Sequence, residues 1–297
     1  MLGDVLVISW FHKVLEETAV GYSDALFLLG IPHRLEHCIS RELTGSSHIF
    51  IVIGIHHYKR LPKFFIAVQT EQAGSTWVTP QFKAKLQRAL AVWDFSKVHA
   101  RDWTCKRACF LPTRIPMSTF FEPKDGSIEA NTDKPIKDID ILFFGGPHER
   151  RFHMKKIFEN MGTNLGFKVV FLVVGESEFI YEDERDALVD RAKLVLNVHF
   201  WSNAALETHR LSYLMSRGAC VLSEPSCDSV LDAMYSESVQ FAPYNALPQA
   251  ALKILGDDRL RARSESKALE LNFRHQFDLR PIQAALKLTL GNLRIKK

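Results

Sequence analysis

The alternation of short apolar runs with amphipathic stretches constrains the fold more than any other feature of this sequence. The apolar runs have the length of buried strands, and the stretches between them repeat apolar residues three or four positions apart, as one face of a helix does. This alternation is typical of parallel sheets with helices on both faces. The expected strands are 4–9, 48–54, 64–68, 91–93, 140–144, 168–174, 194–198 and 219–222, and the expected helices are 16–29, 81–90, 148–161, 185–192, 206–216 and 276–297.

A polar segment divides this pattern into two halves. Residues 122–135 (EPKDGSIEANTDKP) have a proline near each end and a glycine inside, which is typical of a linker. A chain of 297 residues is also long enough for two domains. We therefore predict an α/β protein with two doubly wound, Rossmann-like domains, 1–121 and 136–275, that face each other across a cleft. A C-terminal helix at 276–297 could pack back on the N-terminal domain.

The composition favours a reducing compartment and a small anionic ligand. The five cysteines are odd in number and contain no CxxC pair, and no N-x-S/T sequon occurs. The longest apolar run near the start, Val5–Ile8, is too short for a membrane span. The net charge of +4 comes from scattered residues, whereas duplex nucleic acid usually requires a basic stripe. We expect a protein of the cytoplasm (of the host cytoplasm if a virus encodes it), with no nucleic-acid partner and no membrane span.

The first candidate site follows the expected strand 140–144. Gly145 and Gly146 turn the chain, and Arg150 and Arg151 lie in the first turn of the next helix. Backbone amides at a helix start favour an anion, glycines let the backbone approach it closely, and guanidinium groups match phosphate oxygens. The alternative is an ordinary strand-to-helix turn with two solvated arginines.

A second candidate site follows the expected strand 194–198. Asn197 and His199 alternate along this apolar run, so we expect both on one face near its carboxyl end. Glu207 and Arg210 share one face of the next helix. The carboxylate is well placed for ribose hydroxyls, and the guanidinium for a diphosphate. The alternative is that Glu207 caps its helix and Arg210 pairs with it.

The first half offers two candidates for a general base. His57 follows a strand and a glycine, and the pKa of a histidine lies near neutrality. Because adjacent histidines point in different directions, we expect at most one of His56 and His57 at a site. Glu71 follows the strand 64–68 and could accept a proton from a hydroxyl group. The alternatives are a solvated basic loop for the histidines and a strand-end cap for Glu71.

Three segments of the second half resemble a known family. They are 184–199 (ERDALVDRAKLVLNVH), 206–214 (LETHRLSYL) and 221–224 (VLSE), and looser similarities occur at 70–72, 77–80 and 92–96. Together they resemble a GT-B glycosyltransferase group found in bacteria and large DNA viruses. The resemblance implies a nucleotide-diphosphate sugar, UDP- or GDP-linked, held mainly by the second domain and an acceptor held mainly by the first. It implies no obligatory metal, and we expect no cofactor.

One position departs from the retaining enzymes that carry two glutamates seven residues apart. Tyr213 stands near the place of the second glutamate, before Gly218, so the resemblance does not by itself imply their retaining mechanism. The Asp138–Asp140 pair precedes a strand, the wrong end of a sheet for a metal site.

We therefore expect a metal-independent glycosyltransferase, hexosyl or pentosyl, with a glycan or another hydroxyl compound as acceptor. Glu71 or His57 would act as the base, and Arg150, Arg151 and Arg210 would neutralise the departing diphosphate. Three alternatives stay open: a sugar-nucleotide epimerase or a phosphorylase on the same fold, or a non-catalytic nucleotide-sugar-binding protein.

Overall fold

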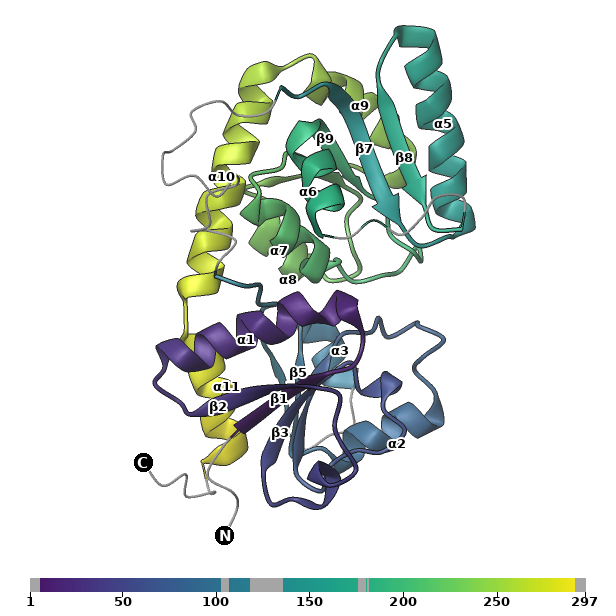
Figure 1. The fold of residues 1–297 in the computed structure, drawn as a ribbon. Coiled ribbons are helices and arrows are strands. Elements are labelled where there is room, and N and C mark those ends of the chain that lie inside the picture. Colours follow the sequence, from purple (N-terminus) through teal and green to yellow (C-terminus); the bar gives the residue numbers. More distant parts are fainter. Residues whose placement is uncertain (1–5, 103–106, 118–135, 176–179, 181, 292–297) are drawn as a thin grey trace. The chain divides into compact units, whose positions relative to one another are not determined.

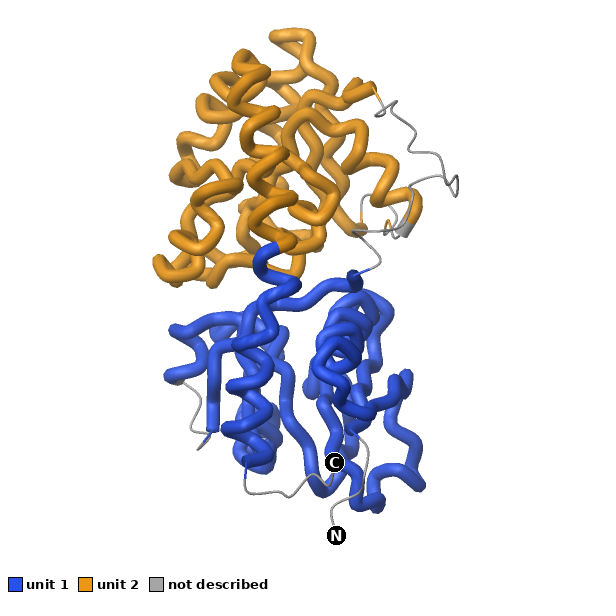
Figure 2. The backbone as a smooth tube through the Cα atoms, turned by 90° about the vertical axis from the view of Figure 1, so that its left-hand side faces the viewer, with its two compact units in different colours: residues 1–118, 274–297 blue, residues 119–273 orange. Residues whose placement is uncertain are grey.

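The computed structural model divides the chain into two compact units (Figure 2). Unit 1 comprises 1–118 and 274–297, and unit 2 comprises 119–273. The residues described are 6–102, 107–117, 136–175, 180 and 182–291, so the predicted linker 122–135 lies outside them.

Unit 1 contains a six-stranded parallel sheet with the order β2-β1-β3-β4-β5-β6 (Figure 1). Helices α1 and α11 pack on one face of this sheet, and α2 packs on the other. The strands are β1 (Leu6–Trp10), β2 (His33–His37), β3 (Ile49–Ile53), β4 (Phe65–Gln69), β5 (Ala91–Asp94) and β6 (Ala108–Phe110), and the helices are α1 (Glu16–Leu28), α2 (Pro80–Arg88), α3 (Lys97–Asp102) and α11 (Arg280–Leu290).

Unit 2 contains a five-stranded parallel sheet with the order β11-β10-β9-β7-β8. Helices α5 and α9 pack on one face of it. The strands are β7 (Ile139–Gly145), β8 (Val169–Val173), β9 (Ala192–Asn197), β10 (Val221–Ser223) and β11 (Val239–Phe241), and the helices are α5 (Glu149–Leu165), α6 (Glu182–Arg191), α7 (Thr208–Ser216), α8 (Ser229–Tyr235), α9 (Leu247–Leu255) and α10 (Asp258–Phe277), of which residues 274–277 belong to unit 1.

Both sheets are doubly wound, and their strand orders place the switch points. The order of the chain reverses between β1 and β3 in unit 1 and between β7 and β9 in unit 2. Ligands of open α/β sheets bind outside the carboxyl ends of the strands at such a point. The loops that follow these four strands are therefore the places to look for functional side chains.

The elements that the sequence pattern did not predict are mostly polar or short. β2 (HRLEH) is an edge strand that pairs only with β1 among the described strands, so it needs no apolar run. No element was expected between 225 and 275, where α8, β11, α9 and most of α10 lie.

The predicted C-terminal helix 276–297 is interrupted, because α10 ends at Phe277 and α11 begins at Arg280. Pro281 lies in the first turn of α11. A proline is tolerated there, whereas inside a continuous helix it would remove a hydrogen bond.

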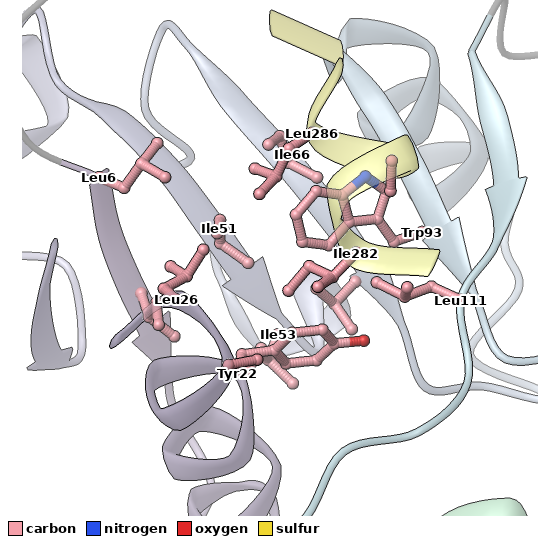
Figure 3. Packing of buried hydrophobic residues seen from close by; sticks show 14 of the residues in the cluster. Leu6, Tyr22, Leu26, Ile51, Ile53, Ile66, Trp93, Leu111, Ile282 and Leu286 are labelled. Carbon is pink, nitrogen blue, oxygen red and sulfur yellow. The ribbon is translucent and has the colours of Figure 1, made fainter. Parts of the chain in front are cut away.

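Helix α11 completes the hydrophobic core of unit 1 (Figure 3). Ile282 and Leu286 pack among side chains of β1, β3, β4 and β5, including the indole ring of Trp93. The Trp93 Nε1 atom donates to Thr289 Oγ1 at 3.4 Å, and Arg107 donates to the Thr289 carbonyl at 3.1 Å. Helix α11, the last helix described, therefore packs on the sheet of unit 1 and belongs to its hydrophobic core.

We predict that Ile282→Ala destabilises unit 1 by about 2–5 kcal/mol, because it removes buried methyl groups and leaves a cavity. Urea unfolding followed by circular dichroism measures this change. Leu288→Ala on the same helix is the control, since Leu288 is 52% exposed, and it should alter stability by less than about 0.5 kcal/mol. Equal effects of the two substitutions would contradict the packing described here.

Candidate functional site

The loop after β7 carries the predicted arginine pair, and Arg151 is buried in it. Its Nε donates to the Val198 carbonyl at 3.0 Å, and its Nη1 donates to the Gly146 carbonyl at 3.1 Å. His148 caps α5 by accepting from the Arg150 backbone N–H. The alternative of a solvated Arg151 is therefore wrong. This side chain joins the loop after β7 to the loop after β9.

Gly145 makes room for that guanidinium group. A Cβ atom at Gly145 would lie 3.1 Å from the Phe143 ring and 3.2 Å from Arg151 Nη1, which is closer than most real contacts. At Gly146 the same atom would be 3.7 Å from Arg151 Nη1, an ordinary contact. A side chain at 145 would therefore require the Phe143 ring or the Arg151 guanidinium group to shift by a few tenths of an ångström, and Gly146 is less constrained.

Arg150 forms an ion pair across the sheet edge. Its Nη2 atom lies 2.5 Å from Glu224 Oε2, and its guanidinium carbon lies 4.2 Å from the centre of the Tyr244 ring. Tyr244 also donates its hydroxyl hydrogen to the Arg150 carbonyl at 2.7 Å. Glu224 accepts from the His199 backbone N–H at 2.8 Å, so it connects Arg150 to the loop after β9.

Glu207 is the centre of a second network. Its Oε2 atom lies 2.6 Å from His199 Nδ1 and accepts from Asn197 Nδ2 at 3.0 Å. Asn197 also donates to Ser223 Oγ at 3.0 Å. Glu207 occupies the N-cap position of α7 but makes no side-chain capping bond. The alternative of a simple helix cap is therefore wrong, and the expected placement of Asn197 and His199 on one face is correct.

Burial and pairing set the protonation states of this network. Burial disfavours the charge on Glu207, but the attraction of His199 outweighs it and lowers the pKa of Glu207 to about 2. Burial likewise disfavours the imidazolium form of His199, and Glu207 outweighs it, so the pKa of His199 is raised. The two side chains therefore form an ion pair in mildly acidic solution.

Arg210 lies against the end of β7. Its Nη2 atom donates to the Phe144 carbonyl at 2.5 Å, and its guanidinium carbon is 4.4 Å from the centre of the Phe144 ring. Burial, and then the charge of Arg151, lower the pKa of Arg210 to about 9, with Glu207 acting in the opposite direction. The alternative paired Arg210 with Glu207. In the structure the Arg210 guanidinium group donates to the backbone of β7 instead.

These side chains gather at the switch point of unit 2. Three guanidinium groups (Arg150, Arg151 and Arg210) and His199 lie with two carboxylates (Glu207 and Glu224) at the carboxyl ends of β7, β9 and β10. The excess of positive charge suits an anion. Ser223 and Glu224 were not among the predicted site residues. Their sequence signals are a polar pair at the end of an apolar strand and their place in the segment 221–224 that carries the family resemblance.

The predicted bases of unit 1 lie together at its own switch point. His56 Nε2 is 3.3 Å from Glu71 Oε1, and Ser75 donates to Glu71 Oε2 at 2.8 Å. The ring centres of His56 and His57 are only 3.9 Å apart, so the expectation that the two side chains diverge is wrong. Both belong to one 3-10 turn (Ile55–His57) that follows Gly54, which has a positive φ of 68°. This tight turn is what keeps the two rings side by side.

Burial shifts the pKa values of these groups in the direction that favours their neutral forms. It raises the pKa of Glu71, with the Ser75 hydrogen bond opposing the shift. It lowers the pKa of His56 to about 4, with His57 adding to the effect. The pKa of His57 is also lowered, by burial and by His12, whose ring centre is 5.6 Å away. At neutral pH both histidines are therefore uncharged, which a proton acceptor requires.

The Asp138–Asp140 pair is engaged by basic side chains. Asp138 pairs with Lys168 and with Arg191, and Asp140 pairs with Lys193 at 2.7 Å. Among the described residues, no group of three or more His, Cys, Asp or Glu side chains is arranged to hold a metal ion. None of the helices described for this chain is long and apolar enough to cross a membrane.

Comparisons with known proteins establish the fold. No protein-family profile matches the chain, and no curated protein matches its sequence. Similar solved structures include WaaG, a glycosyltransferase of lipopolysaccharide biosynthesis (14% identity, 96% of this chain and 99% of that one, TM-score 0.53). Another is T4 phage BGT in complex with its UDP-glucose substrate (10% identity, 96% and 99%, TM-score 0.55). These similarities confirm the predicted GT-B fold with two Rossmann-like domains.

A third similar structure is longer than this chain. S. aureus TarM, solved with UDP bound, shares 12% identity over 83% of this chain and 56% of its own length, with a TM-score of 0.55. The chain thus spans about half the length of TarM.

We predict that Glu207→Gln destabilises unit 2 most strongly between about pH 4.5 and 6.5. The lowered pKa of Glu207 adds stability above 4.5 that is lost as the pH falls toward 2. The raised pKa of His199 adds stability below 6.5 that is lost as the pH rises through its folded value. The loss within this window should be about 1.5–3 kcal/mol, as for a hydrogen bond between charged groups.

Urea unfolding of both proteins over a pH series measures this loss. Glu184→Gln on the exposed surface of α6 is the control, with little expected change at any pH. A loss for Glu207→Gln that is the same at every pH would show that the ion pair does not contribute.

Proposed function

We propose that this protein is a glycosyltransferase that moves a sugar from a nucleotide-diphosphate sugar to a hydroxyl group of a glycan or similar acceptor. The observation that carries the proposal is the cluster of three arginines, one histidine and two carboxylates at the switch point of unit 2. A GT-B fold with this cluster suits a nucleotide diphosphate. UDP, bound in TarM, and UDP-glucose, bound in T4 phage BGT, are the first ligands to test, and GDP-sugars are the second.

In the proposed donor site, Glu207 accepts hydrogen bonds from the ribose hydroxyls, and Asn197 and His199 hold its carboxylate in place. Arg150 and Arg210 face the diphosphate together with the backbone of the Gly145–Gly146 loop. Arg151 donates to two backbone carbonyls, so its main contribution is to fix this loop and to add positive charge. Negative charge develops on the departing diphosphate, and fixed cations stabilise it without reorganisation.

We further propose that transfer, of a hexose or a pentose, needs no divalent metal ion. The guanidinium groups supply the positive charge that a metal would otherwise bring to the diphosphate. The carboxylates of Asp138 and Asp140 are already paired with lysine and arginine side chains. Both observations support a reaction that proceeds in the presence of a chelator.

We propose Glu71 or His57 as the base that removes the proton from the acceptor hydroxyl. The raised pKa of Glu71 brings it closer to neutrality, where a carboxylate is a better general base. His57 is uncharged at neutral pH, and its ring lies against that of His56, which in turn contacts Glu71. His56 is therefore a positioning residue for Glu71.

The cytoplasm is the compartment we propose for this reaction. Cys38 and Cys220 are free thiols. Free thiols are typical of a reducing compartment, which supports the proposal.

We predict that Arg150→Ala weakens UDP binding about 10- to 150-fold, because it removes a charge-assisted bond and leaves Glu224 unpaired beside the diphosphate. Binding of uridine, which has no phosphate, should change little. Calorimetry in EDTA-containing buffer measures both affinities. Arg263→Ala on the exposed surface of α10 is the control and should change neither. Equal weakening of UDP and uridine would remove Arg150 from the diphosphate site.

We also predict that Glu71→Gln lowers the rate of donor hydrolysis about 10²- to 10⁴-fold if Glu71 is the base. The assay follows release of the nucleotide from a panel of UDP- and GDP-sugars, with water as the acceptor. His57→Asn is measured alongside, and the larger loss identifies the base. Glu42→Gln, at an exposed position, is the control. Binding of UDP without hydrolysis of any donor would instead indicate a non-catalytic nucleotide-sugar-binding protein.

A further inference from the structure

Two large aromatic side chains are exposed beside the Glu71–His56 pair. Trp77 is 54% exposed and Phe11 is 47% exposed. The Trp77 ring centre is 5.3 Å from His56 and 6.0 Å from His57. The Phe11 ring is stacked on His57 at 6.1 Å. Exposed aromatic rings that gather around one polar pair usually mark a binding surface.

Trp77 is held in an ordered turn. The Ser75 hydroxyl donates to Glu71 Oε2 at 2.8 Å and accepts from the Trp77 backbone N–H at 3.2 Å. The Trp77 carbonyl accepts from the Thr79 backbone N–H at 2.8 Å, and Thr79 caps α2. One serine thus holds both the Glu71 carboxylate and the backbone of Trp77, so the turn that carries the indole ring is ordered before a ligand binds.

Phe11 is fixed in a similar way at the end of β1. Its carbonyl bonds to His37 Nε2 at 3.1 Å, and its ring meets the edge of Tyr58 at 5.9 Å. The rings of Phe11, His12, His57 and Trp77 therefore come from the loops after β1, β3 and β4, around the switch point of unit 1. We call these four side chains the aromatic platform.

We propose that the aromatic platform binds a sugar ring of the acceptor, with Glu71 accepting a hydrogen bond from one of its hydroxyls. The inference rests on the proposed function, since it names the acceptor of that reaction. A pyranose has an apolar C–H face that packs on the negative face of an aromatic ring, and a rim of hydroxyls that a carboxylate can bind. The platform and Glu71 offer both partners on one surface.

The charges at this surface favour a glycan over a nucleic acid. Nucleic-acid sites combine stacking rings with cations for the phosphates. Here the pKa values of His56 and His57 are lowered, so neither is a cation at neutral pH. The Glu71 carboxylate lies among the rings and would repel a phosphate backbone. A neutral sugar ring meets no such repulsion.

The test uses labelled protein on a printed array that carries glycans and single-stranded oligonucleotides, with UDP in the buffer. We expect wild-type protein to be retained by glycans, and Trp77→Ala to be retained at least about tenfold more weakly. Trp77→Phe keeps an aromatic ring and should retain most of the binding. Phe11→Ala gives a second, independent reading if Trp77→Ala folds poorly.

Phe27→Ala is the matched control, because Phe27 is an exposed aromatic side chain (74%) of α1 that lies outside the platform. Its retention should equal that of the wild type. The proposal is overturned if Trp77→Ala and Phe11→Ala bind glycans like the wild type, if oligonucleotides are retained instead, or if no glycan is retained. A separate thermal-shift measurement with UDP tests the donor site, so failure of the platform and failure of the proposed function give different results.

Discussion

The burial of two parallel sheets on both faces is the constraint on which the rest of this structure depends. Every side chain of β1, β3 and β4 is buried, so polar groups within these strands have little access to a ligand. Functional side chains must then lie where the strands end. In each sheet the strand order reverses beside the first strand of the unit, which gives each sheet one switch point. A polar cluster lies at each switch point.

The cluster of unit 2 remains charged although it is buried, because ion pairs and hydrogen bonds to backbone carbonyls hold its charged groups. A buried charge without a partner destabilises the folded protein. Removing one partner of an ion pair leaves the other charge buried and unpaired. Glu207 keeps its charge through His199 and Asn197, and Arg151 through two backbone carbonyls. The network therefore presents positive charge in a fixed geometry, which supports the proposed binding of a diphosphate.

The cluster of unit 1 has the opposite electrostatic character. Burial keeps His56 and His57 uncharged at neutral pH and raises the pKa of Glu71, so the two histidines can accept a proton and add no positive charge to this surface. The proposed glycosyl transfer needs a cationic site for a nucleotide and a neutral site for a hydroxyl compound, and the two clusters differ in this way. One fold, used twice, carries both because the loops differ while the sheets are alike.

The sequence by itself determined the α/β class, the doubly wound pattern in each half and the polar loops after the strands, because these depend on the periodicity of neighbouring residues. It did not reveal β2 or α10, whose polar sequences carry no such period. Only the tertiary structure decided the partners: Arg150 with Glu224, 74 positions away, and Glu71 with His56 instead of His57. Such pairings depend on which strand ends are adjacent in the sheet. The local sequence pattern does not reveal which strands are neighbours.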